Sequence, residues 1–243
     1  MAAAKRHDGR RADQLRPVKI TPGFVGGADG SCLIETGRTR VICTASFCKG
    51  VPRWRKGSGL GWLTAEYGML PASTGARKAR PTSKGDSRGI EIQRMIGRAL
   101  RNVVRLDRLG ENTIYLDCDV LEADGGTRTA SVTGAQVSLS LAAARGAWSG
   151  GGRRSAVVGR AAAVSVGIVD GRALLDLDYA EDSRAQVDMN VAMLRGGMFV
   201  ELQGTAERTP FTGEQFKRML ALARRGIAGL FRIQTQAIRN GMK

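Results

Sequence analysis

The chain has 243 residues, enough to bury a sizeable core as one large domain or as two closely packed halves. Lysine and arginine number 38 against 22 acidic residues, so the net charge of +16 favours a polyanionic partner such as nucleic acid. Aromatic residues make up only 5%, so a base-stacking platform is not obvious, and the charge fits a protein that grips a phosphate backbone. A basic charge spread evenly over the surface is the alternative.

Composition also limits the catalytic mechanisms that the chain could use. His7 is the only histidine, which argues against a Ser-His-Asp triad, an H-E-x-x-H zinc site and a histidine-pair ribonuclease. Catalysis would therefore rely on carboxylates, a metal, arginine or lysine.

No apolar run approaches the roughly 20 residues of a membrane span, and the N-terminus lacks the apolar core of a secretory signal. No C-x-x-C motif is present, and we expect buried thiols in a reducing cytoplasm at Cys32, Cys43, Cys48 and Cys118.

The chain opens with basic, weakly apolar residues. We expect residues 1–12 to form a basic N-terminal arm, and residues 1–16 to be a partly disordered tail. The alternative is an arm that touches nucleic acid or a neighbouring subunit. Short strands are predicted next at residues 32–35, 39–47 and 62–70.

Residues 71–88 lose the periodic pattern and form a long predicted loop. Long loops in compact domains are usually functional or disordered. The positive charge of this one favours a loop that grips nucleic acid, through Arg77, Lys78, Arg80, Lys84 and Arg88. An amphipathic helix is predicted at residues 90–104, so Arg88 would stand just before a helix start.

A possible anion site follows. Alternation at residues 114–120 predicts a strand, Asp124-Gly125-Gly126 breaks it, and residues 131–144 are typical of a helix. Free N–H groups and the positive end of the helix dipole would point at this turn, and Arg128 adds a planar fork for two phosphate oxygens. From these residues alone, an ordinary turn with a solvated arginine is an equally good interpretation. Two such corners, at Arg88 and Arg128, could face one anion.

The second half has its own strands. Residues 146–160 are rich in glycine and arginine and are predicted to link an N-terminal half, residues 13–145, to a C-terminal half, residues 161–243. Strands are predicted in this second half at residues 161–169, 173–178, 186–194 and 199–204, the first two joined by an Asp-Gly turn. A capping box from Thr212 to Gln215 predicts the start of a closing helix.

A local reversal of charge precedes the strand at residues 186–194. Its five carboxylates are Asp176, Asp178, Glu181, Asp182 and Asp188. Alternation places Asp188 on the polar face of the strand, with Asp182 on the turn that feeds it. Close carboxylates repel unless a cation or a shared proton settles them, and oxygen ligands suit Mg²⁺ or Mn²⁺. By spacing alone, a solvated acidic turn is the better interpretation.

Several longer stretches match one known pattern. Residues 61–71 read Gly-Trp-Leu-Thr-Ala-Glu-Tyr-Gly-Met-Leu-Pro, and further matches are residues 41–46, 91–94, 97–101, 116–134, 163–169, 181–183, 188–190 and 203–207. In these stretches the chain closely resembles the ribonuclease PH family of bacterial phosphate-dependent exoribonucleases. The resemblance runs from about Gly9 to the closing helix, which makes it far more specific than any single short motif.

The resemblance implies an α+β fold of two related sheet-and-helix halves, with mixed β-sheets packed on helices (ribosomal protein S5 domain 2-like). It implies that inorganic phosphate, as co-substrate, attacks the terminal phosphodiester of RNA and releases nucleoside diphosphates in the 3′-5′ direction. The reverse reaction adds nucleotides. The implied task is trimming the 3′ trailer of precursor tRNA, with other RNA 3′ ends as further partners. The implied assembly is a homo-oligomer, a hexamer built as a trimer of dimers.

The resemblance also implies site residues. Arg88, Gly126, Thr127 and Arg128 would bind the attacking phosphate, Asp182 and Asp188 would hold Mg²⁺ or Mn²⁺ or act as the acidic catalytic pair, and Arg77 and Arg80 would contact tRNA.

Two departures from the family concern the loop. Ala72 replaces an arginine that the family often has, and the segment before Arg88 is shorter than in relatives.

Two other functions stay open. One is a non-catalytic, RNA-binding ring subunit of exosome type. The other is a plain single-stranded RNA-binding module, which would explain the charge but not the acidic cluster or the anion corner.

Overall fold

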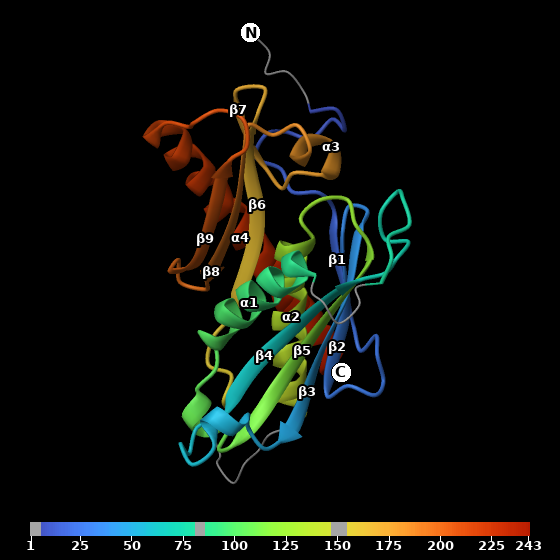
Figure 1. Cartoon of the computed structure of the whole chain (residues 1–243), viewed down its shortest axis with the longest axis vertical. Coiled ribbons are helices and arrows are strands. Elements are labelled where there is room, and N and C mark those ends of the chain that lie inside the picture. Colours follow the sequence, from blue (N-terminus) through green and yellow to red (C-terminus); the bar gives the residue numbers. More distant parts are fainter. Residues whose placement is uncertain (1–5, 81–85, 147–154) are drawn as a thin grey trace.

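The computed structural model describes residues 6–80, 86–146 and 155–243, and its first half is a sheet covered by two helices (Figure 1). The sheet has the order β1-β2-β3-β5-β4; β4 and β5 are parallel and the other pairs antiparallel. Its strands are β1 (Val18–Pro22), β2 (Gly30–Thr36), β3 (Thr39–Lys49), β4 (Trp62–Met69) and β5 (Asn112–Glu122). Its helices are α1 (Ser87–Arg101) and α2 (Thr127–Ala144), with short 3-10 turns at Arg53–Arg55 and Leu106–Arg108.

The second half repeats the sheet-and-helix plan with fewer strands. Its antiparallel sheet has the order β7-β6-β8-β9. The strands are β6 (Ala161–Val169), β7 (Arg172–Leu175), β8 (Val187–Leu194) and β9 (Phe199–Ala206). A short helix α3 (Tyr179–Asp182) precedes β8, and the long helix α4 (Gly213–Gly241) closes the fold. The α+β prediction of two sheet-and-helix halves is confirmed.

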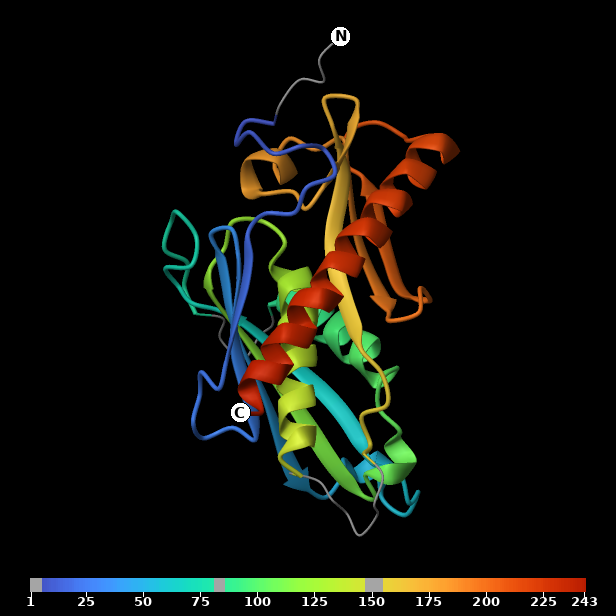
Figure 2. The same ribbon diagram turned by 180° about the vertical axis from the view of Figure 1, so that it is seen from behind.

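Helix α2 holds the two halves together. It packs on β2 and β3 of the first sheet and on β6 of the second, so it is buried on nearly every side. Its interior positions carry alanine, serine and glycine, whose small side chains let both sheets approach closely. Figure 2 shows α4 in the foreground, running across both halves, and it contacts β1, β6 and β7. One hydrophobic cluster includes Leu116, Ala163 and Ile238, so the halves share a core.

Some of the predicted helix and strand bounds agree with the structure, and others differ from it. Strand β6 has the predicted bounds, and in the capping box of α4 the Thr212 hydroxyl accepts from Gln215 N at 3.2 Å. Helix α1 begins at Ser87, so Arg88 lies in its first turn and not before it. Helix α2 begins at Thr127, earlier than predicted, and β1 was not predicted at all.

The prediction of a disordered tail is wrong for residues 6–16. Arg6 and Glu181 form an ion pair in which both side chains are essentially buried, and Arg6 Nη1 also donates to Leu175 O at 2.7 Å. His7 Nε2 lies 2.7 Å from Asp178 Oδ2, so the histidine is held and is not on a mobile segment. The arm is ordered because the acidic cluster of the second half supplies its counter-charge.

Three further expectations can be compared with the structure. Three of the cysteines are buried, but Cys48, at the end of β3, is exposed, so the expectation of a buried thiol is wrong there. Lys84 and most of the predicted link, residues 147–154, lie outside the described residues. In the part of the chain that the structure describes, no helix is long and apolar enough to cross a membrane.

Candidate active site

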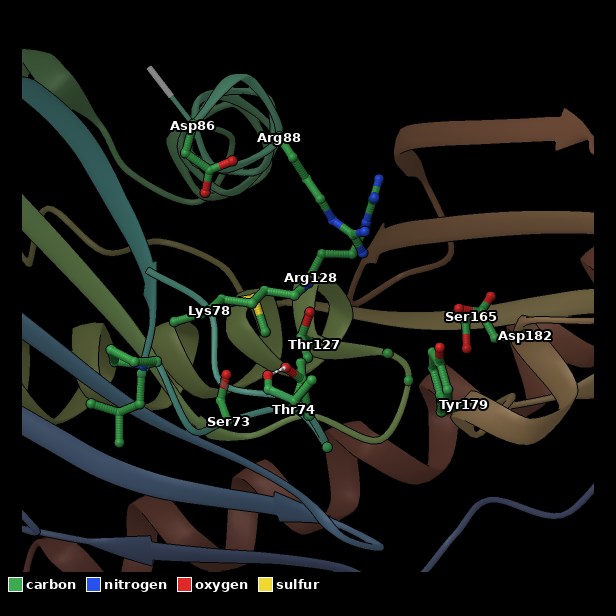
Figure 3. Close-up of a pocket in the computed structure, with 18 of the residues that line it drawn as sticks. Ser73, Thr74, Lys78, Asp86, Arg88, Thr127, Arg128, Ser165, Tyr179 and Asp182 are labelled. Atoms are coloured by element: carbon green, nitrogen blue, oxygen red, sulfur yellow. Dashed lines mark hydrogen bonds between the residues drawn. The ribbon is translucent and has the colours of Figure 1, made fainter. Parts of the chain in front are cut away.

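A cleft of about 880 Å³ opens where the two halves meet, and Figure 3 shows its lining. The first half contributes the loop after β4, the start of α1 and the turn that leads into α2. The second half contributes Ser165 of β6, Tyr179 and Asp182 of α3, and Asp188 and Asn190 of β8. Most of the residues singled out from the sequence therefore line one space.

The glycine turn is shaped by close packing between the halves. Gly125 has a φ of +74°, and a Cβ at this position would lie 2.8 Å from Leu177 O, so only glycine lets the second half pack here. Two hydrogen bonds also hold the turn in place. Thr39 Oγ1 donates to Gly125 O at 2.7 Å, and Arg16 Nη1 donates to Asp124 O at 2.5 Å. Its position in the cleft wall is therefore rigid.

Helix α2 starts directly after this turn. Gly126 is the N-cap residue, with a φ of +68°, and it has no side chain to cap the helix. The N–H groups of the first turn, which lack helical partners, therefore stay available to an anion in the cleft. The hydroxyl of Thr127 lies 2.8 Å from that of Tyr67 in β4, which fixes its orientation. Burial raises the pKa of Tyr67, so this phenol is neutral near pH 7.

Two arginines approach each other at this wall. In Figure 3, Arg88 from α1 and Arg128 from α2 extend their guanidinium groups toward the same region of the cleft. The side chain of Arg128 is only 18% exposed, and its Nη1 donates to Gln203 Oε1 at 2.8 Å and to Glu91 Oε1 at 3.3 Å. The two helix starts do converge as the sequence suggested. Phosphate binding by these groups stays a prediction.

Two carboxylates lie on the opposite side of the cleft. Asp182 ends α3 and Asp188 is on β8, and both are half-buried. Burial, followed by the charge of Asp182, raises the pKa of Asp188 to about 6. Burial also raises the pKa of Asp182, although the positive charges of Arg88 and Arg128 oppose this shift. The charge of Asp182 acts on the pKa of Asp188, and both carboxylates line the same cleft.

This acid pair suits a divalent metal. Mg²⁺ binds through one or two carboxylates and keeps several waters, and Asp182 and Asp188 offer such a set at the edge of an open cleft. Asn190 Nδ2 donates to Asp188 Oδ2 at 3.3 Å, which orients one carboxylate oxygen of Asp188. A Mg²⁺ or Mn²⁺ ion fits these residues.

The structure divides the acidic cluster into two groups. Asp176, Asp178 and Glu181 are buried against residues 6–16, where they pair with Arg6, Arg10 and Arg16. Within the described ranges, one group of three potential metal ligands has all its ligand atoms within 4.8 Å of one another. It consists of His7, Asp8 and Asp178. Arg10 pairs with both of those carboxylates, so a cation is disfavoured there. Of these five carboxylates, the two that line the cleft are Asp182 and Asp188.

The predicted RNA contacts divide as well. Arg80 and Lys78 line the cleft from the loop after β4. Arg77 and Ala72 are exposed but are not part of the cleft wall. The shorter segment before Arg88 falls mainly on residues 81–85, outside the described part of the loop.

Sequence reasoning gave no role to several lining residues. Tyr179 is the main one, because it is 64% exposed and sits on α3 beside the acid pair. The signal for α3 was present: Asp178 and Glu181 form a capping box, which marks the start of a helix. Asp86, the N-cap residue of α1, also lines the cleft.

Comparison with known proteins identifies the family. The model described as "3′ exoribonuclease family, domain 1" matches residues 14–144, and that for domain 2 matches residues 159–226. The chain belongs to the 3′ exoribonuclease family. Its two matched domains correspond to the two sheet-and-helix halves. The resemblance to ribonuclease PH is thus confirmed at the level of the family.

Solved structures show the same family fold. An Archaeoglobus fulgidus exosome with RNA bound to the active site matches with a TM-score of 0.80 and 22% identity, covering 94% of this chain and 92% of that one. An archaeal exosome core matches with a TM-score of 0.75 and 22% identity, covering 95% and 91%. Rrp46 of rice (Oryza sativa) gives 0.75 and 18%, covering 98% and 100%. At these identities the likeness shows the fold alone.

Proposed function

We propose that this member of the 3′ exoribonuclease family degrades RNA by phosphorolysis. Inorganic phosphate would attack the 3′-terminal phosphodiester and release a nucleoside diphosphate, and the reverse reaction would add nucleotides to RNA 3′ ends. One observation carries the proposal: a single cleft places Arg88, Arg128 and the open start of α2 opposite Asp182 and Asp188.

The arrangement matches the main difficulty of phosphorolysis. A phosphate dianion must approach a polyanion, so positive groups must offset charge that builds in the transition state. Arg88, Arg128 and the N–H groups of the α2 start would hold the phosphate for attack. Phosphate is itself the nucleophile, so the reaction needs no histidine. The position of His7 agrees with this, because His7 lies on the arm and pairs with Asp178.

The acid pair would serve the RNA side of the cleft. Asp182 and Asp188 would hold Mg²⁺ or Mn²⁺, which when bound supplies positive charge to a phosphodiester oxygen. Asn190 keeps Asp188 oriented toward the cleft. Lys78 and Arg80, and Arg77 further out, would contact the RNA backbone.

We propose the 3′ trailer of precursor tRNA as the principal substrate and a homohexamer, a trimer of dimers, as the assembly. Sedimentation velocity on the purified protein tests the assembly, because a homohexamer gives one species of six times the chain mass of 25.9 kDa. A monomer at working concentration would contradict it.

The activity is tested with a 3′-extended tRNA and Mg²⁺, with and without inorganic phosphate, followed by identification of the released nucleotide. The proposal expects nucleoside diphosphates that appear only with phosphate. Monophosphates formed without phosphate would indicate a hydrolase and contradict it.

A non-catalytic ring subunit of exosome type is the second candidate, favoured by the exosome structures that share the fold. Tight RNA binding without any nucleotide release, by a protein that sediments as part of a ring, would support that function. The presence of both arginines and both acids in one cleft favours catalysis.

A further inference from the structure

We propose that Glu91 and Gln203 are positioning residues that hold Arg128 ready for phosphate, an inference that rests on the proposed function. The three side chains come from α1, β9 and α2, and they form a closed ring of hydrogen bonds. Arg128 Nη1 donates to Gln203 Oε1 at 2.8 Å and to Glu91 Oε1 at 3.3 Å. Gln203 Nε2 donates to the same Glu91 oxygen at 2.7 Å.

The ring leaves the useful edge of the guanidinium free. Among the described residues, the hydrogen bonds of Arg128 use Nη1 alone. The Nε and Nη2 groups lie along the other edge of the planar fork, and such an edge makes two parallel bonds to a phosphate. Anchoring at Nη1 therefore fixes the orientation of the edge that faces the ligand.

The ring also balances charge in the absence of phosphate. Arg88 and Arg128 extend toward the same region, where two guanidinium groups repel each other (Figure 3). The Glu91 carboxylate forms an ion pair with Arg128 at 3.3 Å, and it lies one helical turn after Arg88 on α1. Glu91 thereby allows both arginines to stay in the cleft wall before an anion arrives.

Gln203 connects this wall to the acid pair. In the β8–β9 pairing it stands opposite Asn190, whose Nδ2 donates to Asp188 Oδ2 at 3.3 Å. Arg128 belongs to the first half and Asp188 to the second. Gln203, a residue of β9, therefore helps to fix the position of Arg128 relative to Asp188.

The test replaces Gln203 by methionine, which keeps the length of the side chain and removes its hydrogen bonds. We expect the KM for phosphate to rise about tenfold, the effect of losing the hydrogen bond that anchors the charged Arg128, while the KM for RNA and the Tm stay near wild-type values. Glu91→Gln keeps an acceptor oxygen and should have a smaller effect than Glu91→Ala. An unchanged phosphate KM in Gln203→Met would overturn the inference.

A matched control comes from the same pair of elements. Glu201 of β9 pairs with Arg98 of α1 at 2.8 Å, so this ion pair also joins the halves, but it does not contact Arg128. Glu201→Gln should leave the phosphate KM unchanged. An equal rise in this variant would mean that loosened packing of α1 on β9 is responsible, which contradicts a positioning role.

A second readout separates this inference from the proposed function. The shift in Tm caused by added inorganic phosphate reports binding without catalysis. If wild-type protein shows neither this shift nor phosphate-dependent release, the proposed function fails. If wild-type protein shows both and Gln203→Met matches it, only the positioning role fails.

Discussion

Arg128 is the residue on which the proposed chemistry depends most. It is held in the cleft wall by Glu91 and Gln203, and it is not part of the hydrophobic core. We expect Arg128→Ala to reduce phosphorolysis by about 10²–10³-fold, as for loss of one preorganised charge-stabilising donor. The Tm should change little. Thermal unfolding and diphosphate release measured side by side check this, with Arg94→Ala, an exposed arginine of α1 away from the cleft, as the control. Normal activity in folded Arg128→Ala protein would rule out the phosphate site.

Asp188 should make stability depend on pH in metal-free protein. Burial and Asp182 raise its pKa to about 6 in the folded state, against about 3.9 in an unfolded chain. Its ionisation therefore costs stability, which is lost as pH rises from about 4 through 6. With EDTA present, we expect Asp188→Asn to be about 1–2 kcal/mol more stable than wild type at pH 7.5, after allowance for solvent screening. The difference should vanish near pH 4.

Denaturant unfolding of both proteins at the two pH values measures this difference. A variant less stable than wild type at pH 7.5 would show that Asp188 ionises without penalty, and would contradict the account of the acid pair.

At the scale of elements, the arm should be essential to the fold. Glu181 is fully buried and neutralises Arg6, so Glu181→Gln leaves a buried guanidinium without its counter-charge. We expect a loss of about 3–5 kcal/mol in the free energy of unfolding. Arg11→Ala breaks an ion pair whose arginine is 75% exposed and should cost at most about 1 kcal/mol. Urea unfolding distinguishes the two, and equal midpoints for both variants would refute an essential arm.

The elements also show what the sequence could predict. Strand β6 was predicted with its bounds because a largely apolar run ends at Asp170-Gly171, a dipeptide typical of a tight turn, and both residues do have positive φ in the structure. Helix α2 was predicted to start too late because Thr127, Arg128 and Thr129 carry no apolar periodicity. The arm could not be placed, because pairing Arg6 with Glu181 depends on a contact between distant parts of the chain that leaves no local pattern.

At the scale of the molecule, the cleft exists only because the two halves pack against each other. The sequence identified Arg128 and Asp182 as candidates, but their encounter depends on the shared core around α2 and on Gly125, where a side chain would separate the halves. Lining residues such as Tyr179 and the ring around Arg128 lie at the same junction. Their roles depend on side-chain direction and packing, which the periodicity of one chain does not record.

The most direct test of the account follows the phosphate itself. The protein is incubated with a 3′-extended tRNA, Mg²⁺ and inorganic phosphate labelled with heavy oxygen, and the released nucleotides are analysed by mass spectrometry. Phosphorolysis predicts nucleoside diphosphates with the label in the β-phosphate, and no label in the shortened RNA. Unlabelled nucleoside monophosphates would show that water is the nucleophile and would contradict the central claim.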